Sequence, residues 1–143
     1  MRQSKAEVYL HLVWAALGRE PFLTAEIERP VYRCIENEAK RLDCEVLAIG
    51  GMPDHGHLCV KLPTPLAIAK MMNQIKGVSS HFVPDHLSDR PAFRWQKGYG
   101  VLSVGPNQVR NVLAYIGDQK RHHSDNSLHD RWKETGEDYQ PRS

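Results

Sequence analysis

The sequence predicts an α+β fold of the ferredoxin-like (RRM-like) type, an antiparallel sheet with two helices on one face, followed by a C-terminal helix. Two observations predict it. Apolar and branched runs mark strands while apolar residues at helical spacing mark helices, and these elements follow in the order β-α-β-β-α-β-α. The length of 143 residues fits one domain. We expect a single domain over residues 1–143, with a core spanning about 8–123 and a polar C-terminal tail over 124–143.

The first half of the chain supplies three strands and one helix. Residues 8–15 (VYLHLVWA) form a branched, aromatic run typical of a buried strand. Thr24 is a candidate N-cap for a helix that ends near Asp43. Residues 45–50 (EVLAIG) form a second strand closed by GGMPD, and residues 55–62 (HGHLCVKL) form a third. In a ferredoxin-like sheet, the first and third strands lie side by side in the centre.

The second half supplies two helices around one strand. A helix begins near Pro65, and residues 84–91 read as a loop. Residues 93–104 (FRWQKGYGVLSV) predict a bent strand or a hairpin with glycine hinges. The last helix runs from Gln108 to about His122. The spacing predicts a buried face made of Val109, Val112, Leu113 and Ile116.

Composition excludes several classes of protein. With 41% hydrophobic and 25% charged residues, the chain has an ordinary globular composition. No apolar run approaches the ~20 residues that cross a bilayer, and the N-terminus does not resemble a signal peptide. We therefore expect a cytoplasmic protein, nucleoid-associated when bound to DNA. The three cysteines form no C-x-x-C pair, which disfavours a disulfide framework and a cysteine zinc site.

Basic residues are concentrated in one half of the chain. Residues 61–121 hold nine Lys or Arg and three acidic residues, a local charge of +6, although the whole chain carries only +2. Such a half is typical of a phosphate-binding face, but a solvated lysine-rich surface explains it equally well. Interleaved aromatic residues can stack on unpaired bases or lie in the core, and Phe93 favours the core. The candidate nucleic-acid contacts are Lys70, Lys76, Arg94, Trp95, Lys97, Tyr99, Arg110, Lys120 and Arg121.

A pair of histidines opens the third strand. Because side chains alternate along a strand, His55 and His57 share one face while Gly56 points to the other. Two imidazoles so placed can chelate one metal ion. Taken alone, however, an H-x-H sequence is more often a pair of surface or hydrogen-bonded histidines. His11 on the first strand can lie near this pair, and a structural role is its simpler interpretation.

The last helix carries a separate polar stripe. Asn111, Tyr115 and Gln119 recur every four residues. A phenol one turn from an amide oxygen, on a helix beside the H-x-H strand, is a candidate nucleophile with a candidate metal ligand. The alternative is an amphipathic helix whose tyrosine packs at a rim.

Together these segments resemble the single-tyrosine HUH transposases, which include the TnpA-type insertion-sequence transposases and the REP-associated tyrosine transposases. The resemblance covers most of residues 8–123, in family order. Its five blocks are VYLHLVW, LAIGGMPDHGHLCVKLP, IKGVSS, FRWQKGYGVLSV and VRNVLAYIGDQKRHH.

The resemblance implies a function and a set of site residues. Tyr115 matches the catalytic tyrosine, while His55, His57 and Gln119 match the metal ligands. The implied activity is metal-dependent cleavage and rejoining of single-stranded DNA at hairpin-marked element ends, through a 5′-phosphotyrosine intermediate. The implied cofactor is Mg²⁺ or Mn²⁺, and two imidazoles with an amide suit Mn²⁺ at least as well as Mg²⁺. Family members work as homodimers, in some of which the tyrosine acts in trans.

One position departs from the family pattern. The middle residue of the motif is normally bulky and hydrophobic, and here it is Gly56. Since its side chain would point to the core, we expect glycine to remove packing and loosen the strand, at a cost of about 1–3 kcal/mol. It removes no metal ligand.

Three other functions remain open on the sequence. The first is a non-catalytic, domesticated or inactivated protein of the same fold that binds hairpins or single strands. The second is a metal-dependent hydrolase with Asp54 as its general base, against which the Tyr115 and Gln119 pairing argues. The third is a dimerising structural domain without activity.

Overall fold

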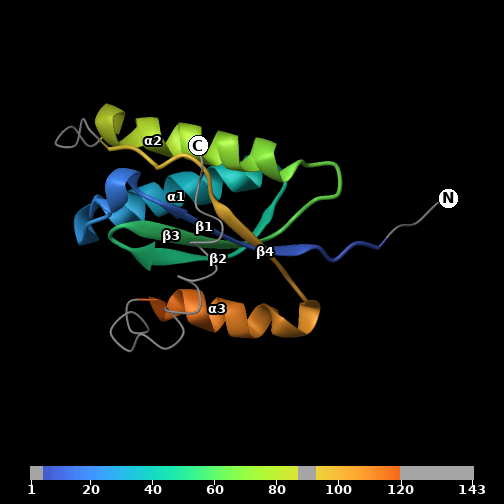
Figure 1. Cartoon of the computed structure of the whole chain (residues 1–143). Coiled ribbons are helices and arrows are strands. Elements are labelled where there is room, and N and C mark those ends of the chain that lie inside the picture. The colour runs from blue at the N-terminus through green and yellow to red at the C-terminus, as the bar shows by residue number, and fades with distance from the viewer. Residues whose placement is uncertain (1–4, 87–92, 120–143) are drawn as a thin grey trace.

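A computed structural model describes residues 5–86 and 93–119, which form a four-stranded antiparallel sheet flanked by helices (Figure 1). The sheet order is β2-β3-β1-β4, so the first and third strands are central, as predicted. The expected α+β, ferredoxin-like fold is therefore confirmed. The strands are β1 (Tyr9–Ala15), β2 (Glu45–Met52), β3 (His55–Lys61) and β4 (Gly100–Val104), and the helices are α1 (Ala25–Arg41), α2 (Ile68–His86) and α3 (Val109–Gly117), with short 3-10 turns η1 (Leu17–Arg19) and η2 (Pro106–Gln108).

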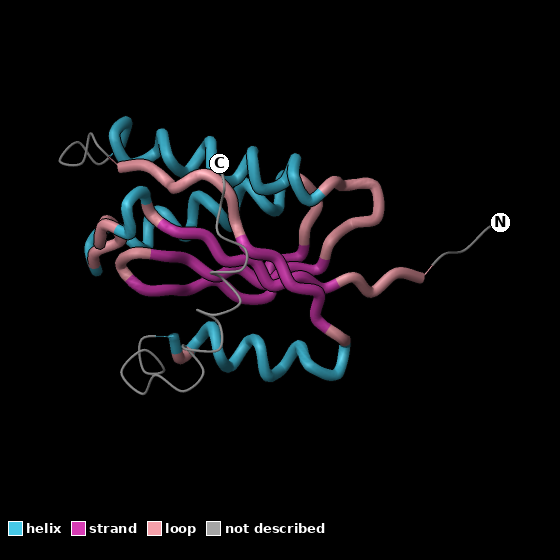
Figure 2. The backbone as a smooth tube through the Cα atoms, in the orientation of Figure 1, coloured by secondary structure: helices cyan, strands magenta, loops and turns pink. Residues whose placement is uncertain are grey.

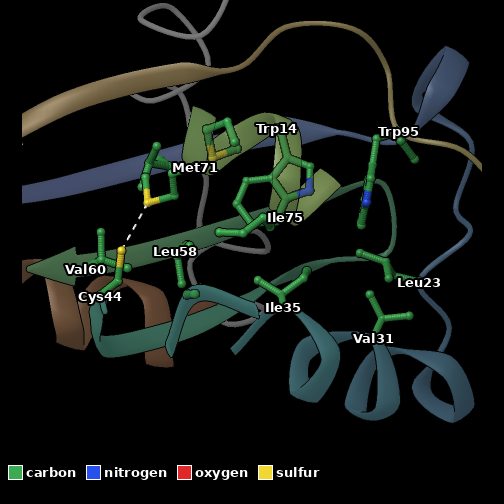
Figure 3. Packing of buried hydrophobic residues seen from close by; sticks show 14 of the residues in the cluster. Trp14, Leu23, Val31, Ile35, Cys44, Leu58, Val60, Met71, Ile75 and Trp95 are labelled. Carbon is green, nitrogen blue, oxygen red and sulfur yellow. Dashed lines mark hydrogen bonds between the residues drawn. The ribbon is translucent and has the colours of Figure 1, made fainter. Parts of the chain in front are cut away.

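The helices divide between the two faces of the sheet. Helices α1 and α2 cover one face, and α3 is the one described helix on the other (Figures 1 and 2). The main core fills the space between the sheet and the α1–α2 layer, with Trp14, Leu58, Met71 and Ile75 among its buried side chains (Figure 3). None of the described helices has the length and apolar character needed to cross a membrane.

Strand β2 is longer than predicted because it runs through the two glycines that were expected to end it. Gly50 and Gly51 pair with His57 and Gly56 on β3. A Cβ atom on Gly51 would collide with the carbonyl oxygen of His55. The glycines therefore let β2 pair closely beside the histidine motif, instead of breaking the strand.

Other boundaries also differ from expectation. Helix α2 begins at Ile68 and not near Pro65, and α3 begins at Val109 after a 3-10 turn. The expected helix end at His122 and the tail over 124–143 lie outside the described residues. Thr24 stands at the N-cap of α1 but makes no capping hydrogen bond through its side chain.

The segment 93–104 does not form a hairpin. Residues 100–104 form β4 at the sheet edge, and the preceding stretch passes beside α2 (Figure 1). A single bridge between Ala16 and Trp95 ties that stretch to the end of β1. The glycine at 98 has a positive φ of 84°, and the chain passes through this left-handed residue before entering the strand.

The expected packing defect at Gly56 is absent. Gly56 lies opposite Trp14 in the β1–β3 ladder. A Cβ atom on Gly56 would lie 3.1 Å from Cζ2 and 3.3 Å from Cε2 of Trp14. The expectation that glycine leaves the core underpacked is therefore wrong, because the indole of Trp14 occupies the space that a larger side chain would need.

Candidate active site

Helix α3 packs directly on the face of the sheet that carries the histidine motif. Ile116 and Tyr115 are buried with Cys59, and Val112 and Leu113 pack beside them. A Cβ atom on Gly50 would come within 2.9 Å of the carbonyl oxygen of Ile116. Glycine at this position of β2 therefore allows the close approach of the helix backbone.

The two motif histidines and the tyrosine lie together in one chain. His55 and His57 are 5% and 1% exposed, with ring centroids 5.0 Å apart. The ring of Tyr115 meets His57 edge-on, at 5.6 Å between centroids and an interplanar angle of 80°. Gln119, one turn further along, is also buried. The structure thus brings together three of the predicted site residues, His55, His57 and Tyr115, and buries the fourth, whereas Asn111 is exposed.

A carboxylate holds the first histidine. Nδ1 of His55 lies 2.7 Å from Oδ1 of Asp54, and Oδ2 of Asp54 lies 3.0 Å from Nη2 of Arg19. Burial alone would raise the pKa of Asp54, but His55 and Arg19 outweigh it and hold that pKa well below its usual range. The residue therefore accepts from Nδ1–H as a carboxylate. A carboxylate so stabilised is a poor general base, which weakens the hydrolase alternative.

The second histidine contacts a third one. Nε2 of His11 lies 2.9 Å from Nδ1 of His57, and His11 is fully buried on the neighbouring strand. Burial lowers the pKa of His11 to about 4, so its imidazole is neutral at pH 7. Sequence reasoning favoured a structural role for His11 and did not include Arg19. The alternation of side chains along β1 predicts that His11 shares a sheet face with the histidine motif. Its contact with His57 joins residues 46 positions apart, so no local sequence pattern indicates it.

Tyr115 is protonated in this environment. Burial raises the pKa of Tyr115 to about 12, and a hydrogen bond with Gln119 acts in the opposite direction. At neutral pH the side chain is thus a phenol, and it needs a nearby positive charge to react as a phenolate.

The donor set fits a divalent cation of the manganese or magnesium kind. Both histidines turn Nδ1 toward a protein partner, so a metal ion held by both rings would bind through Nε2. Within residues 5–86 and 93–119, no three His, Cys, Asp or Glu side chains are grouped to hold a metal. Among these described residues, a third protein ligand would have to be of another type, and the buried Gln119 amide is of that type.

Four of the predicted nucleic-acid contacts gather at one cleft, away from Tyr115: Lys76, Arg94, Trp95 and Lys97. A cleft of about 720 Å³ lies between α2 and residues 93–98, and Lys76, Arg94 and Lys97 line it together with Asn73 and Ser80. This cleft is on the α1–α2 side of the sheet, whereas α3 lies on the other side (Figure 1). Exposed Arg110 is on α3 and exposed Lys70 is on α2. Lys120 and Arg121 lie outside the described residues.

Lys76 is partly committed to the fold. Its Nζ donates to the carbonyl oxygens of Gln96 and Gly98 at 2.7 and 2.6 Å. Burial lowers the pKa of Lys76 to about 8. The ammonium group therefore fastens the 96–98 segment to α2.

The aromatic candidates are largely internal. Trp95 is 8% exposed, and its Nε1–H donates to Oγ of Ser79 at 2.7 Å. Phe93 is buried, as the sequence favoured, and Tyr99 packs against the same core. Only part of the Trp95 side chain borders the cleft, and base stacking by Trp95 and Tyr99 stays a prediction.

A second cavity, missed by sequence reasoning, adjoins the tyrosine helix. It measures about 390 Å³ and lies between Gly50 and Gly51 of β2, Tyr32 of α1, and Gln119, which follows the end of α3. The paired glycines are the sequence signal that could have indicated it, since they leave this stretch of β2 without side chains.

Fold and site together define a ferredoxin-like domain with paired histidines beneath a tyrosine-bearing helix. The sequence profile described as "Transposase IS200 like" matches residues 4–119. This chain therefore belongs to the IS200-like transposase family, and it shares that family's general activity on DNA. No curated protein matches it significantly.

Two solved structures share the fold. A protein assigned as a transposase, from Deinococcus radiodurans R1, is 23% identical, with a TM-score of 0.65, and the match covers 83% of this chain and 98% of that one. A REP-associated tyrosine transposase bound to a REP hairpin is 16% identical, with a TM-score of 0.63, covering 86% of this chain and 73% of that one.

Proposed function

We propose that this transposase cleaves and rejoins single-stranded DNA at hairpin-marked ends through a 5′-phosphotyrosine intermediate. Tyr115 is the nucleophile, and His55, His57 and Gln119 hold Mg²⁺ or Mn²⁺. The observation that carries the proposal is the edge-on contact of the Tyr115 ring with His57. It puts a phenol beside a pair of imidazoles whose Nδ1 atoms face His11 and Asp54.

The chemistry balances without an external energy source. Oη of Tyr115 attacks the scissile phosphorus, a bond forms between them, and the bond from phosphorus to the 3′-oxygen breaks. The phenol proton passes to water, and the leaving oxygen takes a proton from water to give a 3′-OH. A second 3′-OH can attack the phosphotyrosine and restore Tyr115, so the phosphodiester energy is retained.

The bound cation would supply Lewis-acid polarisation of the phosphate, and stabilise negative charge near the phenolate. The protein's own residues fix the geometry. Helix α3 sets the position of Tyr115, and Asp54 orients His55. Because two imidazoles and an amide are neutral ligands, they would leave the full charge of a bound cation to act on the phosphate.

We also propose that Tyr115 acts in cis. Helix α3 packs on the sheet of its own chain, so no partner is needed to bring Tyr115 to His57. Mixing a Tyr115→Phe chain with a His57→Ala chain should then restore no cleavage. Restored cleavage would mean that the tyrosine acts in trans, across the homodimer that the family resemblance implies.

The DNA-binding part of the proposal rests on charge and on a structural relative. Lys76, Arg94 and Lys97 line one cleft, and a protein with the same fold is bound to a REP hairpin. The cleft and Tyr115 lie on opposite faces of the sheet. We therefore propose that the hairpin binds in the cleft and that its single-stranded flank passes around the edge of the sheet to reach Tyr115 on α3.

A covalent-adduct assay tests the function. Purified protein is incubated with Mn²⁺ and labelled hairpin DNAs that carry randomised single-stranded flanks, and then run on an SDS gel. We expect an SDS-resistant shifted band with the wild type, none with Tyr115→Phe, and an unchanged band with Tyr9→Phe. Tyr9 is a suitable control because it is a partly exposed tyrosine at the start of β1.

The other outcomes are equally informative. Hairpin binding without an adduct, across all flanks, would contradict catalysis and leave a binding protein of the same fold. An adduct that survives Tyr115→Phe would assign the nucleophile elsewhere. Replacing Mn²⁺ by a chelator should abolish the adduct, and its persistence would refute the metal dependence.

A further inference from the structure

A buried histidine outside the motif touches one of the motif histidines. His11 and His57 lie on adjacent strands, where His57 pairs with Val13 and His11 pairs with Cys59. Both side chains therefore project from the same face, two residue pairs apart along the ladder. Nε2 of His11 and Nδ1 of His57 are 2.9 Å apart, a hydrogen-bond distance, and the two ring planes are tilted by 40°.

This contact can exist in two tautomeric forms. A neutral imidazole carries one proton, so either Nδ1–H of His57 donates to Nε2 of His11, or Nε2–H of His11 donates to Nδ1 of His57. In the first form Nε2 of His57 has a lone pair. In the second form Nε2 of His57 carries the proton and cannot bind a metal.

The other motif histidine indicates which form is used. His55 places Nδ1 2.7 Å from Asp54, and a carboxylate can only accept. His55 is thus fixed with its proton on Nδ1. If His57 follows the same pattern, both rings present an unprotonated Nε2 atom from one face of β3. Two histidines that bind the same metal ion through Nε2 require this arrangement.

We propose that His11 is a positioning residue that accepts the Nδ1–H of His57 and so keeps Nε2 of His57 available to the metal ion. The inference rests on the proposed function, since it concerns the orientation of a proposed ligand. His11 does for His57 what Asp54 does for His55, with a neutral acceptor in place of a carboxylate. His11 itself binds neither the ion nor the DNA.

Two substitutions separate hydrogen bonding from packing. In His11→Gln, the glutamine Oε1 is separated from Cα by the same number of bonds as Nε2 is in histidine. This variant therefore retains a hydrogen-bond acceptor at the same distance along the side chain. His11→Phe fills the buried position with a ring that accepts nothing. Circular dichroism and urea unfolding establish that each variant is folded before it is compared.

The first readout is the tautomer of His57 in metal-free protein. Long-range ¹H–¹⁵N correlation spectra distinguish a protonated from an unprotonated ring nitrogen. We expect Nδ1 of His57 to be protonated in the wild type and in His11→Gln, and the Nε2-protonated form to grow in His11→Phe. Protonation of His57 on Nε2 in the wild type would overturn the proposal. This measurement uses only the wild-type protein, so it does not depend on whether the variants fold.

The second readout is Mn²⁺ affinity, measured by calorimetry. Loss of a hydrogen-bond partner behind a metal-binding histidine typically weakens binding about 10–100-fold. We expect that loss for His11→Phe and a smaller one for His11→Gln. Equal affinities in wild type and His11→Phe would refute the role of His11. A wild type that binds no Mn²⁺ would instead refute the proposed metal site, while the spectra still decide the tautomer.

Discussion

Replacing Gly56 by the kind of larger residue that the family motif carries should destabilise this protein. In Gly56→Val, Cβ alone would lie 3.1 Å from Cζ2 of Trp14, and the two γ carbons extend beyond it. The indole cannot easily yield, because Trp14 is 2% exposed and packs edge-on against Trp95 at 5.8 Å. Overpacking of this kind costs about 1–3 kcal/mol.

Two opposing effects set the net magnitude. Valine has a higher strand propensity than glycine, and this difference stabilises the folded protein by up to about 1 kcal/mol. We therefore expect Gly56→Val to lower the free energy of unfolding by about 1–2 kcal/mol, measured by urea denaturation. Gly77→Ala is the matched control, since a Cβ there meets no atom within 4 Å, and it should stabilise α2 by about 0.5–1 kcal/mol.

A double-mutant cycle identifies the cause. Trp14→Phe removes Cζ2 from the side chain, and Nε1 of Trp14 has no hydrogen-bond partner among the described residues, so the change breaks no such bond. In the Trp14→Phe background, Gly56→Val should be tolerated, with a favourable coupling energy of about 1–2 kcal/mol. A stabilising Gly56→Val, or a coupling energy near zero, would refute this reasoning.

Three further predictions concern buried polar groups. The pKa of His11 is about 4 in the folded protein, against an ordinary value of 6.5. Between these two pH values His11 is therefore protonated in the unfolded chain but neutral in the folded protein. The free energy of unfolding should therefore fall by up to about 3 kcal/mol between pH 6.5 and 4, and His11→Gln should show a shallower fall in urea titrations at each pH. Ser79→Ala leaves the indole N–H of Trp95 without its acceptor, and should cost about 1–3 kcal/mol in urea unfolding, whereas the less buried Ser80→Ala should stay within about 0.5 kcal/mol. Lys76→Met removes two hydrogen bonds to backbone carbonyls and should speed amide hydrogen exchange in residues 96–98; unchanged exchange would mean that the ammonium does not hold this segment.

Periodicity in the sequence was sufficient to predict the fold and the histidine pair. The period of two in β3 places His55 and His57 on one face with Cys59, and the spacing of four in α3 places Tyr115 beside Gln119. These relations are local, because each depends only on the geometry of one element. The positions of the elements in the sheet followed from their order along the chain.

What the sequence could not predict depends on contacts between distant segments. The Trp14–Gly56 contact and the His11–His57 hydrogen bond both depend on the register of β1 against β3. Gly50 and Gly51 looked like a strand terminator, because glycine composition cannot distinguish a turn from a close backbone approach. Basic residues were grouped by sequence, whereas the chain distributes them over both faces of the sheet.

The apolar core and the candidate catalytic residues lie on opposite faces of the sheet. The α1–α2 side buries most of the apolar core, while the α3 side buries His11, His57, Tyr115 and Gln119. Burying so many polar groups under a nine-residue helix costs free energy, which the opposite face must offset. Gly56 and Trp14 belong to that offsetting face, although Gly56 lies between the two motif histidines. Substitutions at Gly56 should therefore change stability more than metal affinity, whereas substitutions at His11 should change both.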